Sequence, residues 1–145
     1  MSRKGFTLVE LMVVILIVAI LAAVAIPIMR GRIDAAKWSE GKAMMGTIAT
    51  ALRAYCAGWD GLPDGSDSPL DLTDLNGKFD QLGILDNDLD GTYFDFGNFT
   101  ILSGSYDVPN NIILFTIEGQ KGTGINSPES YTLDNEGIWI ASEGL

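Results

Sequence analysis

Residues 5–10 read GFTLVE, and residues 11–29 continue as LMVVILIVAILAAVAIPIM without a polar side chain. As an α-helix that rises about 1.5 Å per residue, this segment is long enough to cross most of a bilayer core about 30 Å thick. Arg3 and Lys4 precede it. A carboxylate at the edge of such a segment is energetically costly, so Glu10 is a candidate functional residue.

Four positions in this segment match the pattern of a known family. Gly5 ends a short basic leader, Phe6 follows it directly, Glu10 comes one turn later, and Pro27 interrupts the apolar run. The segment resembles the N-terminus of type IV prepilins and of the related type II secretion pseudopilins. This resemblance implies cleavage after Gly5, N-methylation of Phe6, a role for Glu10 in the register between assembling subunits, and a helix kink at Pro27.

The leader, residues 1–5, differs from an ordinary secretory signal, in which the cleavage site follows the apolar core. Here the candidate cleavage site precedes the apolar run, so residues 6–29 are expected to stay in the mature chain as a transmembrane and filament-core helix. A plain signal anchor is the alternative, but it does not explain Gly5, Phe6 and Glu10 together.

Basic residues lie on both sides of the apolar run, so the positive-inside rule does not fix its orientation. The resemblance places the leader in the cytoplasm. It implies a single-pass precursor in the bacterial inner membrane, followed by an extracellular pilus filament or a periplasmic pseudopilus.

After the apolar run, apolar residues recur every three or four positions with charged residues between them. This spacing predicts that residues 30–58 are the amphipathic half of the same helix, with Gly58 as its stop. The expected buried stripe comprises Ile33, Ala36, Met44 or Met45, Ile48, Leu52, Tyr55, Cys56 and Trp59.

Residues 59–145 are predicted to form the globular domain. Residues 59–91 are rich in turn-forming residues and are expected to be a loop region, with a short helix or irregular loop over residues 70–82. Residues 92–145 change to a strand pattern. Strands are expected at residues 93–96 and 99–102, interrupted at Gly97 or separate, and at residues 112–118, 131–133 and 138–140.

These elements predict an α+β fold in which one long N-terminal helix packs on a C-terminal antiparallel sheet of three or four strands. The amphipathic half of the helix is the available cover for one face of the sheet. That arrangement is the pilin fold, and it follows from the strand and helix patterns independently of the N-terminal motif.

Charge and composition exclude several classes of function. The formal net charge is −10, and residues 60–145 hold 16 of the acidic residues but only Lys78 and Lys121 as basic ones. Such a domain is not suited to bind nucleic acid, which requires Lys and Arg against phosphates. The chain has no histidine and one cysteine, Cys56, so an intrachain disulfide cannot form, and a buried inert thiol is expected. Nothing in the sequence predicts an enzyme or a resident cofactor.

One acidic turn is a weak calcium candidate. Asp86, Asp88 and Asp90, followed by Gly91, match the front of a D-x-D-x-D-G calcium loop. The acidic ligand that normally closes such a loop would fall at Gly97, so the full pattern fails. A solvated acidic turn is the alternative.

These features predict a structural subunit of a type IV pilus. The partners implied by the resemblance are a prepilin peptidase, identical subunits in a helical filament, and an inner-membrane pilus assembly platform. Within the same class, the alternative is the major pseudopilin of a type II secretion system. In a different class, it is a monomeric membrane-anchored binding domain.

Overall fold

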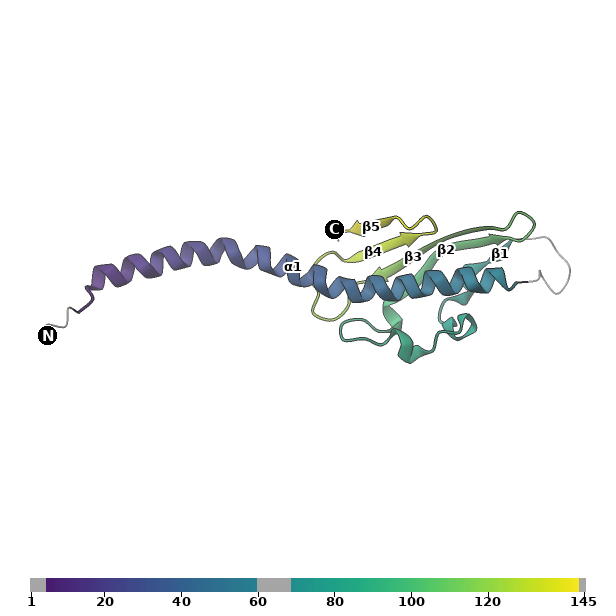
Figure 1. Ribbon diagram of the computed structural model, residues 1–145, viewed down its shortest axis with the longest axis horizontal. Helices are drawn as coiled ribbons and strands as arrows, with labels where there is room; N and C mark the ends of the chain where they lie inside the picture. Colours follow the sequence, from purple (N-terminus) through teal and green to yellow (C-terminus); the bar gives the residue numbers. More distant parts are fainter. Residues whose placement is uncertain (1–4, 60–68, 144–145) are drawn as a thin grey trace. The chain divides into compact units, whose positions relative to one another are not determined.

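The computed structural model describes residues 5–59 and 69–143 of the chain. It divides into two compact units, Met1–Ala35 and Ala36–Leu145, and the helix α1 (Leu8–Ala57) runs through both (Figure 1). The turn signals predicted within residues 60–68 lie outside the described residues.

Helix α1 ends where the sequence predicts. The amide of Gly58 donates to the carbonyls of Ala54 and Tyr55, which closes the last turn. At the other end, helical geometry begins at Leu8, two residues after the expected start at Phe6. Pro27 lies inside α1, which is helical on both sides of it.

The amphipathic half of α1 buries one stripe in the globular unit. Met45, Ile48, Leu52 and Cys56 are all fully buried, at spacings of three and four residues, as predicted. The prediction was wrong for Ile33 and Ala36, which are exposed. Trp38 extends this stripe by two turns toward the N-terminus. Its ring centroid lies 5.0 Å from that of Phe94 and 4.8 Å from that of Tyr131.

The sheet has five antiparallel strands in the order β1-β2-β3-β4-β5. Their bounds are β1 (Leu70–Asp71), β2 (Phe99–Asp107), β3 (Ile112–Gln120), β4 (Ser130–Asp134) and β5 (Trp139–Ser142). The predicted number of three or four strands was therefore wrong. The extra strand is β1, which pairs Leu70 with Tyr106 over only two residues. A strand this short shows no alternating pattern, so only its partner reveals it.

The predicted strand at residues 93–96 was also wrong. Residues 93–95 form no strand, and Phe96–Asn98 is a 3₁₀ turn. The Asp95 side chain accepts from the Gly97 amide at 2.9 Å, and the Asn98 side chain accepts from the Asp95 amide at 2.8 Å. These short polar side chains compete with a strand ladder for the backbone groups.

The segment between β1 and β2 folds as three further 3₁₀ turns, Leu72–Leu75, Phe79–Leu82 and Asp86–Leu89. Each contributes buried apolar side chains to the core of the globular unit. Figure 1 shows these turns and the sheet beside the C-terminal half of α1. The short helix or irregular loop expected at residues 70–82 is present as β1 and two 3₁₀ turns that pack on the core, as predicted.

Candidate functional site

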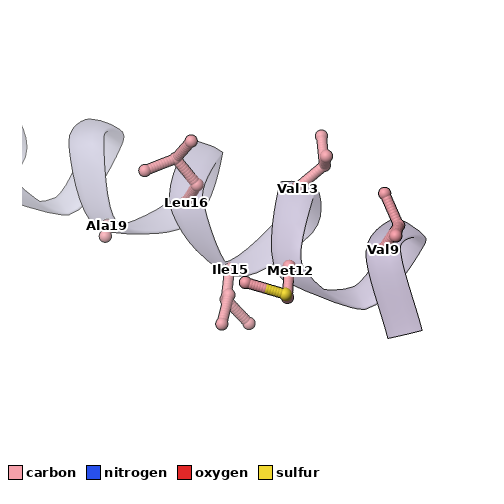
Figure 2. A pocket seen from close by; sticks show the side chains of 6 residues that line it. All are labelled: Val9, Met12, Val13, Ile15, Leu16 and Ala19. Atoms are coloured by element: carbon pink, nitrogen blue, oxygen red, sulfur yellow. The ribbon is translucent and has the colours of Figure 1, made fainter.

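The N-terminal half of α1 is bare. Every large apolar side chain from Phe6 to Met29 is at least 49% exposed. Figure 2 shows a hollow on this helix that is lined by Val9, Met12, Val13, Ile15, Leu16 and Ala19. All six residues come from the same helix, so the hollow has no opposite wall and cannot enclose a ligand. By length and composition this helix can cross a membrane.

A hydrogen-bonded ring closes the start of this helix. Glu10 Oε2 accepts from the Thr7 amide and from Thr7 Oγ1, both at 2.8 Å, and Thr7 Oγ1 accepts from the Glu10 amide at 3.2 Å. This reciprocal arrangement is a capping box, in which an N-cap Thr and a Glu three residues later satisfy free backbone donors. Thr7 is a site residue that the sequence interpretation missed, although the pattern T-x-x-E before an apolar run signals it.

The capping box uses only one oxygen of the Glu10 carboxylate. Within residues 5–59 and 69–143, no hydrogen-bond donor is found for Glu10 Oε1. Glu10 is exposed, and a carboxylate near a helix N-terminus is favoured by the helix dipole. Glu10 can therefore cap its own helix and accept a second donor at the same time.

Gly5 and Phe6 lie just before this ring, and both are exposed. No described atom lies within 4 Å of the position that a Cβ on Gly5 would take. The fold therefore does not require glycine at position 5. The rest of the leader, including Arg3 and Lys4, lies outside the described residues.

The three aspartates of the calcium candidate do not converge. They belong to the 3₁₀ turn Asp86–Leu89 and the residue after it, and Asp88 Oδ2 accepts from the Leu85 amide at 2.9 Å. In the described part of the chain, no group of three or more acidic or cysteine side chains is placed to hold a metal ion.

A second carboxylate, Glu40, anchors the loop before β2 to α1. Its Oε1 accepts from the Tyr93 amide at 2.8 Å and from the Phe94 amide at 3.2 Å. A Cβ on Gly91 would lie 2.2 Å from the same oxygen, so this approach requires glycine. The Phe94 ring in turn fills the space beside Gly41, where a Cβ would lie 2.6 Å from the ring. The sequence shows Glu40 only as a charged position on the helix, and the contact became visible only in the structure.

Three basic residues of α1 are held within the globular unit. Lys37 Nζ donates to the Gly124 carbonyl, Lys42 Nζ lies 3.8 Å from the centre of the Tyr131 ring, and Arg53 donates to the Asn135 carbonyl at 3.1 Å. The cations above aromatic rings or on carbonyls help to fix α1 against the sheet.

Cys56 is fully buried, as predicted. Burial raises the pKa of its thiol to about 11. Since the thiolate is the reactive form, Cys56 has the properties of an inert core residue.

The N-terminal segment of this chain is similar to a known protein family. Residues 1–26 match the family described as the prokaryotic N-terminal methylation motif. No solved structure matches the chain significantly.

Several named proteins are similar over longer stretches. The chain is 33% identical to a fimbrial protein of Moraxella nonliquefaciens over 103 residues, which is 66% of this chain and 67% of the relative. It is 45% identical over 54 residues to type II secretion system core protein G of Pseudomonas aeruginosa, covering 37% of this chain and 38% of that protein. It is 33% identical over 86 residues to fimbrial protein EcpB of Eikenella corrodens, covering 59% and 54%. Together with the N-terminal motif and the helix-on-sheet fold, these similarities show that the chain belongs to the family of type IV pilins and pseudopilins.

Proposed function

We propose that this chain is the structural subunit of a type IV pilus. It is made as a single-pass precursor in the bacterial inner membrane, and a prepilin peptidase cuts it after Gly5 and methylates the new amine of Phe6. An inner-membrane assembly platform then adds it to a helical filament of identical subunits. The observation that carries this proposal is the bare apolar half of α1.

The N-terminal half of α1 exposes so much apolar surface that it is not expected to be surrounded by water. Burial of a Val, Leu, Ile or Met side chain is worth about 1.5–3 kcal/mol, and every such residue from Leu8 to Met29 is exposed. A helix that is apolar on all sides belongs in a membrane or a protein core. Lipid meets this need before assembly, and the same helix in neighbouring subunits meets it afterwards.

Glu10 supplies the polar contact in this apolar environment. An unpaired carboxylate at the centre of a membrane helix costs roughly 2.5–3.5 kcal/mol on insertion scales. Its Oε2 is used by Thr7, which leaves Oε1 for the amine of Phe6 in a neighbouring subunit. In a low-dielectric core, the interaction energy of two opposite charges depends strongly on the distance between them. This contact therefore sets the axial register between subunits.

Three substitutions separate the two roles of the ring. Glu10→Val removes cap and charge, Glu10→Gln keeps an acceptor for the cap but removes the charge, and Thr7→Val weakens the cap but keeps the charge. All three variants should insert and be cleaved after Gly5. We expect both Glu10 variants to enter filaments poorly and Thr7→Val to assemble, as measured by filaments sheared from cells relative to mature subunit in the membrane. If Glu10→Val assembles at the wild-type rate and with the same subunit rise, Glu10 does not set the register.

The second candidate function is that of the major pseudopilin of a type II secretion system. The 45% identity over 54 residues to a type II secretion core protein favours it. A pseudopilin builds a short periplasmic fibre, whereas a pilin builds a long surface fibre. Electron microscopy of cells labelled for this chain distinguishes the two.

A monomeric anchored binding domain is the alternative from another class. It predicts that the chain purifies from membranes as single subunits under all conditions. Copurification of the chain as a filament excludes this alternative.

A further inference from the structure

Two arginines, Arg30 and Arg32, directly follow the apolar run. Arg30 and Arg32 are exposed, and no hydrogen bond or ion pair joins either of them to another described residue. Asp34, one turn beyond Arg30, is buried and has an interaction of its own. The other basic residues of α1 are held by carbonyls and aromatic rings of the globular unit, as described above.

The globular unit has an excess of acid near the point where α1 enters it. Glu40, close to the start of this unit at Ala36, holds the backbone of Tyr93 and Phe94, so the preceding acidic turn lies at this end. Asp86, Asp88 and Asp90 of that turn are exposed. Asp88 caps the Leu85 amide, whereas no hydrogen bond to the side chains of Asp86 or Asp90 is found among the described residues.

We infer that Arg30 and Arg32 of one copy bind the acidic turn, residues 86–90, of a second copy in the filament. This inference rests on the proposed function, because it requires that copies assemble through α1. The charged contact would continue the apolar interface beyond Met29.

Charge complementarity favours a second copy as the partner. Residues 60–145 carry a net charge of −14, so neighbouring globular domains repel one another unless cations lie between them. Arg30 and Arg32 follow the apolar interface within one helical turn, so packing of the apolar helices also brings them beside neighbouring copies. A guanidinium group binds carboxylates through two parallel hydrogen bonds, which gives the contact directional specificity.

Charge reversal on both sides tests this pairing in the full-length chain expressed in its pilus-forming host. Arg30→Asp/Arg32→Asp should lower the yield of sheared filaments by about tenfold, since like charges then face each other. The amount of mature, membrane-inserted subunit should stay unchanged. Adding Asp86→Lys/Asp90→Lys to the same chain should restore most of the yield, and Asp88 is kept because it caps the turn.

A matched control reverses the same amount of charge elsewhere in the globular unit. Glu118→Lys/Glu136→Lys places two lysines on β3 and on the β4–β5 hairpin, and it should not restore filaments of the arginine variant. Unchanged tryptophan fluorescence should show that each variant is folded, because Trp38, Trp59 and Trp139 all belong to the globular unit.

Each further outcome decides between explanations. A wild-type filament yield from Arg30→Asp/Arg32→Asp would overturn the pairing. If that variant does lose filaments, the pairing is also wrong when both lysine pairs restore the yield equally, or when neither pair restores it. A loss of membrane-inserted subunit in the arginine variant would instead assign the arginines to anionic lipid headgroups. If the wild-type chain itself yields no filament, the proposed function fails. If wild type assembles and only the rescue fails, the pairing alone is wrong.

Discussion

Thr7 and Glu10 form one hydrogen-bonded ring, so a residue expected to act between subunits also has a role within its own chain. The ring holds the Glu10 carboxylate at the helix start with its second oxygen available. In the proposed filament, the cap would therefore orient Glu10 toward the amine of a neighbouring subunit. Replacing a Thr N-cap typically costs about 0.5–2 kcal/mol, which is small beside the burial of the apolar helix.

Gly5 is expected to matter to the peptidase and not to the fold. No described atom occupies the space of a Cβ at this position, so Gly5→Leu should leave the folded chain unchanged. A residue without a side chain lets the backbone lie close to a protease, so the variant should accumulate as uncleaved precursor. Gly31→Ala is the matched control, since a Cβ there also meets nothing within 4 Å, and it should be processed normally. Immunoblots that show equal cleavage of both variants would contradict the role of Gly5.

Among the elements, the loop before β2 depends on one carboxylate from α1. Glu40→Ala removes the acceptor of the Tyr93 and Phe94 amides, which are partly buried. Buried donors left unpaired cost about 1–3 kcal/mol, so the free energy of unfolding should fall by about that amount. Denaturant unfolding of the detergent-solubilised chain, followed by tryptophan fluorescence, measures this change. Glu136→Ala, on an exposed hairpin, should change it by less than about 0.5 kcal/mol, and equal effects of the two variants would refute the anchoring role of Glu40.

Pro27 is predicted to mark the place where α1 loosens during assembly. Proline has no amide hydrogen and clashes with the carbonyl four residues earlier, so the turn before it is the easiest one to extend. In this structure α1 is helical on both sides of Pro27. A filament map should show lengthened or broken hydrogen bonds at residues 24–27, and an unbroken helix there would refute the prediction.

Long elements with strong periodicity were predictable from the sequence. Elements that are very short, or that are held by residues distant in the sequence, were not. The buried stripe of α1 and the strands β3 and β4 follow from spacings that one chain segment contains by itself. β1 depends on a partner, Tyr106 of β2, and the segment at Tyr93 and Phe94 is held by Glu40 of α1. At the N-terminal site, the sequence indicated Glu10 as a functional residue. Its hydrogen bond to Thr7 was missed, because the segment was interpreted as a membrane helix and its T-x-x-E sequence was not recognised as a capping box.

For the whole molecule, thermal stability tests whether the turn at residues 86–90 binds calcium. If a cation binds only the folded state, a free concentration of 100 times its Kd raises the free energy of unfolding by about 2.7 kcal/mol. The turn is already closed by Asp88 on the Leu85 amide, and its carboxylates do not converge. We therefore expect millimolar calcium and chelator to give the same melting temperature. A higher melting temperature in calcium would establish a site there.

Mass spectrometry of the mature N-terminus tests the central proposal most directly, because the proposed assembly requires a processed chain. Subunits sheared from cells should begin at Phe6, and fragmentation should place one added methyl group on the amine of that residue. A mature chain that still begins at Met1, or one cut after the apolar segment, would contradict the proposal that this protein is a processed pilin that polymerises through its N-terminal helix.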